Sequence, residues 1–139
     1  MRNIIITLCL GMSLFLNLPK SAMALGLGPA ELHSHWGEPL ALSIPIYLGK
    51  RDSIDALRAQ LAEPSVWQQL QIDYRFAYNS IRFELTDTAP YMLKVSSEKS
   101  FTEPFVELVV AVSSASQTVN RSLTVLLDPP EIQGTIAHK

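Results

Sequence analysis

Apolar and polar residues alternate along several segments of this 139-residue chain, as they do in a β-strand with one buried face. Between Pro39 and Leu48, every second residue is leucine or isoleucine. The same period recurs at residues 81–86, 91–95 and 118–127. With turn-forming residues between these segments, the pattern predicts a mainly β chain of about six or seven short strands, folded as a small β-sandwich of Ig-like or similar kind. A small α+β domain is the alternative.

Residues 105–112, FVELVVAV, are almost entirely apolar, with Glu107 as the one polar residue. A strand that is buried on both faces has this composition, so we predict a central strand of a packed sheet. Pro104 precedes the segment, at a position where a missing N–H costs little. We expect Glu103 to lie just outside the core.

Pro45 lies on the outer side of the segment 39–48 and has no N–H to donate to a neighbouring strand. We therefore predict that this segment is an edge strand or contains a bulge. The shorter segment 30–34 is expected to be its hairpin partner. The polar sequence SSEKS, residues 96–100, is expected to form a turn.

Residues 52–70 break the alternation and predict one short helical insertion. Their apolar residues are spaced three and four apart, as on one face of a helix: Ile54, Leu57 and Leu61. We predict that this helix is capped at Asp52 or Ser53 and stopped by Pro64, because the residue before a proline avoids helical angles. The pair Ser65–Gln68 predicts a capping box for one further turn.

The first 24 residues have the pattern of a secretory signal peptide. Arg2 precedes an apolar stretch from Ile4 to Leu18, and Ala22-Met23-Ala24 matches the small-x-small cleavage site. We predict a cleaved signal at residues 1–24, a β domain at 25–130 and a flexible tail at 131–139. An uncleaved membrane anchor is the alternative to cleavage.

Cleavage would remove Arg2, Lys20 and the single cysteine, Cys9. The formal net charge of −2, from 11 Lys and Arg against 13 Asp and Glu, would then become −4. An exported chain without cysteine must be stabilised by its core rather than by disulfides. A mildly acidic chain without clustered basic residues is not expected to bind nucleic acid.

The strongest candidates for a metal site are Glu31, His33 and His35. On a strand they would project from one side and could bind zinc or copper. We favour a polar outer face that runs into a turn, since no cysteine accompanies these residues and His138 is the one remaining histidine.

Other polar and aromatic residues have ordinary structural interpretations. Asp128 precedes two prolines, which is common turn chemistry, and we interpret Glu103 and Glu107 as solvated or capping residues. We expect Trp67 to be the residue that its short helix buries in the core. The chain has neither a nucleophile elbow nor a glycine-rich phosphate loop. We therefore predict no catalytic residue, no cofactor and no resident metal.

Several short motifs occur in a characteristic order: Leu25-Gly26-Leu27-Gly28, Leu32-His33-Ser34, Glu38-Pro39-Leu40, Glu103-Pro104-Phe105 and Thr124–Pro130. In this order they resemble the N-terminal periplasmic domain of FimV-type proteins, over residues 25–130. Those are inner-membrane proteins of type IV pilus assembly and cell-pole organisation. The resemblance implies a non-enzymatic domain outside the cytoplasm that contacts other envelope or pilus-assembly proteins.

Members of that family usually continue into a peptidoglycan-binding LysM module, a transmembrane helix and a cytoplasmic part with tetratricopeptide repeats. This sequence shows no LysM module and no second apolar span, so peptidoglycan binding and a span in the mature chain are not expected. We predict a periplasmic protein-interaction module, with the strand edge at 39–48 as a candidate contact. The alternative is a small periplasmic metal- or ligand-binding protein that uses Glu31, His33 and His35.

Overall fold

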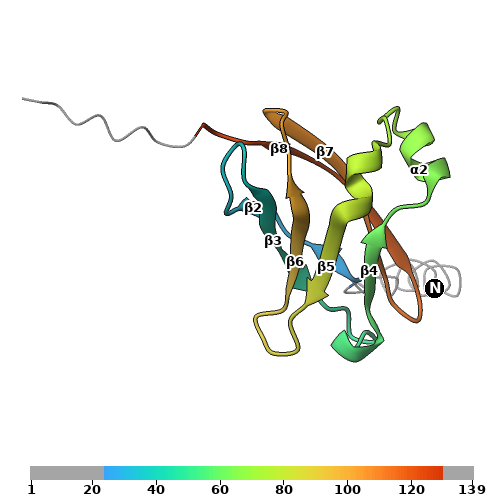
Figure 1. The fold of residues 1–139 in the computed structure, drawn as a ribbon. Helices are drawn as coiled ribbons and strands as arrows, with labels where there is room; N and C mark the ends of the chain where they lie inside the picture. The colour runs from blue at the N-terminus through green and yellow to red at the C-terminus, as the bar shows by residue number, and fades with distance from the viewer. Residues whose placement is uncertain (1–23, 130–139) are drawn as a thin grey trace, which may run out of the picture.

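The computed structural model of the chain describes residues 24–129 and shows two antiparallel β-sheets packed face to face (Figure 1). Sheet one has the order β1-β3-β6-β5, with β2 also paired to β3, and sheet two has the order β4-β7-β8. The strands of sheet one are β1 (Gly26–Leu27), β2 (Glu31–Leu32), β3 (Pro39–Tyr47), β5 (Ile81–Leu85) and β6 (Met92–Ser100). The strands of sheet two are β4 (Arg58–Leu61), β7 (Phe105–Ser113) and β8 (Thr118–Leu126). The predicted β-sandwich is confirmed.

Two of the predicted segments lie outside the described residues: the signal peptide as far as residue 23 and the tail at 131–139. Between residues 24 and 129, no helix combines the length and the apolar character that a membrane crossing requires.

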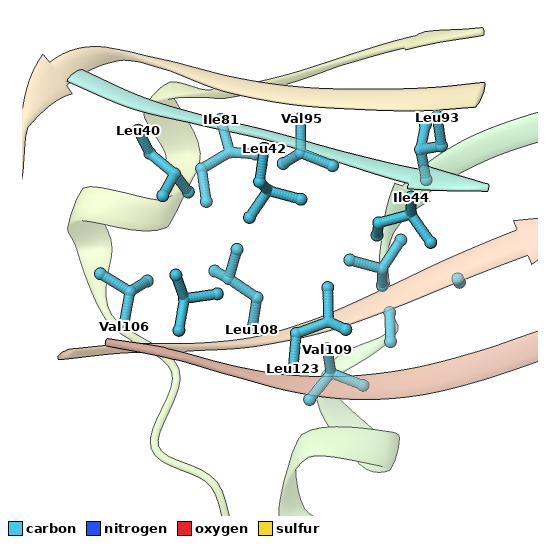
Figure 2. Close-up of a cluster of buried hydrophobic side chains, with 14 of the residues drawn as sticks. Leu40, Leu42, Ile44, Ile81, Leu93, Val95, Val106, Leu108, Val109 and Leu123 are labelled. Atoms are coloured by element: carbon cyan, nitrogen blue, oxygen red, sulfur yellow. The ribbon is translucent and has the colours of Figure 1, made fainter. Parts of the chain in front are cut away.

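The core lies between the inward rows of the two sheets (Figure 2). Every second residue of β3 and β6 points towards the inward residues of β7 and β8. This burial of alternate residues explains the two-residue period of apolar residues in the sequence. The fully buried residues shown in the figure include Leu40, Leu42, Ile44, Leu93, Val95, Val106 and Leu108. Each such side chain contributes about 1.5–3 kcal/mol by its removal from water.

Strand β7 is the central strand of sheet two, as predicted, and it is buried on both faces. Val109 points away from sheet one (Figure 2) yet is completely buried. The Ala62 N–H donates to the Val109 carbonyl over 2.8 Å, and Trp67 Nε1 donates to the Ala62 carbonyl over 2.9 Å. These bonds place helix α2 (Pro64–Gln69) beside the outer face of β7.

The prediction that residues 39–48 form an edge strand is wrong, because β3 lies between β6 on one side and β1 and β2 on the other. The Pro45 carbonyl accepts a hydrogen bond from the Gly28 N–H over 2.7 Å. Pro45 has no N–H, so it cannot donate a hydrogen bond back to the Gly28 carbonyl. The donor that is missing from the ladder is therefore on the side of β3 that pairs with β1. The predicted hairpin partner is confirmed, since Glu31 of β2 pairs with Ser43 of β3.

A bulge does occur in β3, but at its start: the register with β6 shifts between Pro39 and Ala41. The buried Ser97 hydroxyl accepts from the Leu40 N–H over 2.8 Å and donates to the Lys99 carbonyl over 2.6 Å. This hydroxyl satisfies the backbone where the ladder is interrupted. The predicted turn at residues 96–100 is therefore wrong, because β6 continues through Ser100.

The predicted helix over Ile54, Leu57 and Leu61 is also wrong. Residues Ile54–Ala56 form one 3-10 turn, and residues 58–61 are strand β4. Pro64 begins helix α2 instead of stopping a helix, because its fixed φ and missing N–H suit the first helical position.

The predicted capping box at Ser65–Gln68 does not form. The N-cap of α2 is Glu63, and it makes no side-chain cap hydrogen bond. The further helical turn itself is confirmed as α2, with Trp67 as its buried residue. A second 3-10 segment, η3 (Phe76–Ser80), leads into β5.

The two glycines of β1 and its flank differ in the space around them. A Cβ added at Gly28 would lie 3.0 Å from Pro45 Cβ and 3.1 Å from Tyr47 Cε2, whereas one at Gly26 meets nothing closer than 3.9 Å. We expect Gly28→Ala to lower the free energy of unfolding by about 1–3 kcal/mol through overpacking, and Gly26→Ala to have a smaller effect. Urea denaturation of both variants measures the difference, and equal losses would contradict the close packing of Gly28.

Candidate interaction surface

Three chain segments that are distant in sequence meet at one end of the sandwich, at the top of Figure 1. They are the β2–β3 loop (residues 33–38), the β6–β7 loop with the first residue of β7 (101–105), and the end of β8 with the residues after it (126–129). We call these residues together the Trp36 end. They include all of the motif at 103–105 and parts of the motifs at 32–34, 38–40 and 124–130.

Trp36 joins the three segments through both of its N–H groups. Its backbone N–H donates to the Asp128 carbonyl over 2.9 Å, and its ring Nε1 donates to the Thr102 carbonyl over 2.9 Å. The Leu127 N–H in turn donates to the Pro104 carbonyl over 2.7 Å. The arrangement of this end is thus fixed by hydrogen bonds as well as by packing.

The β2–β3 loop is also closed internally. The His35 N–H donates to Glu38 Oε2 over 2.8 Å, and this bond is the main cause that lowers the pKa of the Glu38 carboxyl below its usual value. Gly37 has a φ of 87°, a left-handed conformation that glycine adopts without steric cost. A short glycine turn therefore holds Trp36 in place.

Large apolar side chains are exposed at the Trp36 end. The exposed fractions are 44% for Trp36, 40% for Phe105 and 69% for Leu126. Phe105 and Leu126 are directly opposite each other on β7 and β8, where side chains of neighbouring strands contact. Grouped exposed apolar residues of this kind are typical of protein contact sites.

A groove and an ion pair border these apolar residues. The groove, of about 180 Å³, lies between β2 and β8 and is lined by Ala30, Leu32, Leu42, Thr124, Val125 and Leu126. Arg75 forms an ion pair with Glu103, and the hydrogen bond that the guanidinium donates to this carboxylate raises the pKa of Arg75. The apolar surface thus has one ion pair at its border, next to Phe105.

A cluster of aromatic side chains packs against the β6–β7 loop of the Trp36 end. Trp67 stacks on Tyr78 with a ring-centroid distance of 5.5 Å, and Tyr78 packs against Phe101 of the β6–β7 loop at 6.2 Å. Tyr74 meets Trp67 edge to face at 5.3 Å. Burial raises the pKa of the Tyr78 hydroxyl. This cluster connects α2 and η3 with the loop that carries Thr102 and Glu103.

The structure does not arrange the three residues considered for a metal site as a set of ligands. Glu31 lies on β2, and His33 just after it has its Nε2 2.7 Å from Ser43 Oγ. His35 lies beyond the strand, with Nδ1 3.4 Å from Glu38 Oε2. In the described part of the chain, residues 24–129, no group of three or more His, Cys, Asp or Glu side chains is arranged to hold a metal ion.

The other polar candidates have structural contacts. The Asp128 carbonyl accepts the Trp36 N–H. Glu103 is paired with Arg75, while Glu107 lies on β7 opposite Thr124. Sequence reasoning did not find the exposed Phe105–Leu126 pair, because only the register of β7 with β8 brings these residues together.

Comparison with known proteins identifies relatives of this chain. The family described as the FimV N-terminal domain, an Ig-like domain, matches residues 25–130. Proteins named Motility hub protein FimV, from two strains of Pseudomonas aeruginosa, are each 27% identical over 111 residues. The match covers 78% of this chain and 12% of each relative, so the chain corresponds to a small part of those proteins. No solved structure matches the chain significantly.

Proposed function

Because the chain belongs to the FimV N-terminal domain family, we propose that it is a non-enzymatic protein-interaction module in type IV pilus or envelope assembly. Its relation to motility hub proteins supports a role related to pili or motility. The match covers 12% of each relative, so the partners of those whole proteins are not assigned to this chain.

The proposed location is the periplasm. The signal-peptide pattern of residues 1–24 supports export, and the β domain at 25–130 would begin directly after the cleavage site. Residues 25–139 contain no cysteine, so an exported domain would depend on the apolar core between its two sheets for stability.

The proposed contact surface is the Trp36 end. The observation that carries this proposal is the grouping of exposed Trp36, Phe105 and Leu126 on a backbone fixed by hydrogen bonds. Exposed aromatic residues on a rigid support lose little entropy on binding, and such residues dominate the binding energy of many interfaces. This surface replaces the segment 39–48 as the proposed contact, because β3 already has partners on both edges.

Site-specific photocrosslinking in cells that carry type IV pili tests this function. A photoreactive phenylalanine analogue replaces Phe105 in one variant and Tyr47 in the other. Both residues are exposed aromatics, but Tyr47 is at the far end of β3 from the Trp36 end. We expect adducts with a pilus or envelope protein from position 105 and far fewer from position 47. Equal capture at both positions, or no such protein at either, would contradict the proposal.

A further inference from the structure

Strand β8 has one paired edge and one free edge. It pairs with β7 along its whole length, from Thr118 to Leu126, and it is the last strand of sheet two. Hydrogen-bonded and non-bonded pairs alternate in an antiparallel ladder. The Leu127 N–H donates to the Pro104 carbonyl, and the Ser114 N–H donates to the Gln117 carbonyl. These two bonded pairs show which residues of β8 have their backbone groups directed towards β7.

The odd-numbered residues of β8 therefore bond to β7, and the even-numbered residues direct their N–H and C=O groups to the free edge. These residues are Thr118, Asn120, Ser122, Thr124 and Leu126, and all are exposed. No strand in residues 24–129 pairs with them. The free edge ends where the β2–β3 loop closes it, because the Asp128 carbonyl accepts the Trp36 N–H.

This edge lacks the features that usually prevent strand pairing. Natural edge strands are commonly short, bulged, or protected by charge or proline. Strand β8 is nine residues long, while the other edge strands, β1, β2, β4 and β5, have two to five residues. Its register with β7 is continuous, and none of its even-numbered residues is charged or a proline.

The side chains around the free edge of β8 do not block it with charge. The groove between β2 and β8 adjoins Thr124 and Leu126. Arg121 is the one charged residue of β8, and its guanidinium donates to the carbonyls of Leu27 and Gly28. The charged group of Arg121 is therefore hydrogen-bonded on the inner side of the strand and does not lie at the free edge.

We infer that β8 pairs with β8 of a second copy of this chain, antiparallel about a two-fold axis at Ser122. Ser122 would then face its own copy, Asn120 would face Thr124, and Thr118 would face Leu126. Each pair could exchange two backbone hydrogen bonds, and the two three-stranded sheets would become one continuous sheet.

A second copy is the occupant that this edge fits best. The edge is uncharged, so two copies bring no like charges together although the chain carries a formal net charge of −2. A charged partner strand would find no complementary charge on the even-numbered residues. A two-fold contact also presents the same patch twice, as in most homodimers.

Disulfide trapping tests the register directly. In the chain from residue 25 to residue 139, which has no native cysteine, Ser122→Cys places two thiols on the axis. Opposed residues of a bonded antiparallel pair have Cα atoms about 5.5 Å apart, which is within disulfide range. We expect a rapidly formed disulfide dimer. Ser96→Cys is the control, because Ser96 is exposed on β6 between two strands, and its dimer should form slowly.

Sedimentation of the same chain tests the energetics. We expect a reversible dimer whose dissociation constant rises about tenfold or more with Ser122→Lys, because like charges then meet on the axis. Ser96→Lys should leave the dissociation constant unchanged. A chain that is monomeric and is not trapped at position 122, or a dimer insensitive to Ser122→Lys, would overturn the inference. Capture of a pilus protein from position 105 does not depend on this dimer, so the two proposals can fail separately.

Discussion

Replacing Trp67 with alanine should lower the free energy of unfolding by about 3–5 kcal/mol. Trp67 is 1% exposed although it belongs to a helix of six residues. Its removal would leave a cavity beside β7, next to Tyr78, and would leave the Ala62 carbonyl without its donor. Both effects act on the outer face of sheet two, which is otherwise open to water at β8.

Chemical denaturation followed by far-UV circular dichroism measures this loss. Trp36→Ala is the matched control, because Trp36 is 44% exposed and loses one side-chain hydrogen bond. We expect it to cost about 1 kcal/mol. A Trp67 variant that is no less stable than the Trp36 variant would show that α2 does not cover β7.

Replacing Arg121 with methionine should lower the free energy of unfolding by about 1.5–3 kcal/mol, the range for hydrogen bonds to a charged group. Arg121 lies on the inner row of β8, and its Nη1 bonds to the carbonyls of Leu27 and Gly28. The Gly28 carbonyl needs this donor because its strand partner, Pro45, has no N–H. Methionine keeps the apolar part of the side chain and removes the donors.

Arg82→Met is the control for this substitution. Arg82 pairs with Glu98 on the surface of sheet one, and the two side chains are 62% and 59% exposed. Exposed ion pairs of this kind contribute about 0–1 kcal/mol. Urea titrations of both variants measure the difference. A loss for Arg121→Met that is as small as that for Arg82→Met would contradict its role as a link between the sheets.

Strands β6 and β8 could be predicted from the sequence because their burial alternates along the strand, whereas β7 could be predicted from its nearly continuous apolar composition. The error at residues 54–61 has a specific cause. Leu57 and Leu61 are four apart, a spacing that fits one face of a helix and also one face of a strand. Only the pairing of Leu61 with Val110, and of Ala59 with Val112, shows that β4 is a strand.

The edge prediction for residues 39–48 failed for a reason that no local pattern carries. A proline in an interior strand leaves a neighbouring carbonyl without a donor, and here Arg121 supplies that donor from a strand 93 residues later in the chain. The prediction of a turn at the polar residues 96–100 failed for a similar reason. Ser97 is buried because its hydroxyl completes the bulge at Leu40.

The candidate surface could be predicted only in part. The five ordered motifs, among them Glu103-Pro104-Phe105 and Thr124–Pro130, predicted the family, and the family match confirms it. Their meeting with Trp36 depends on hydrogen bonds between segments separated by 66 residues or more. The His33 candidate is explained by its contact with Ser43, which the sequence does not show.

Photocrosslinking from Phe105 in living cells tests most directly whether this domain works by contacting envelope proteins. We predict an adduct with a pilus or envelope protein that is abundant at position 105 and scarce at position 47. Similar adducts from both positions, or none with such a protein from either, would contradict it.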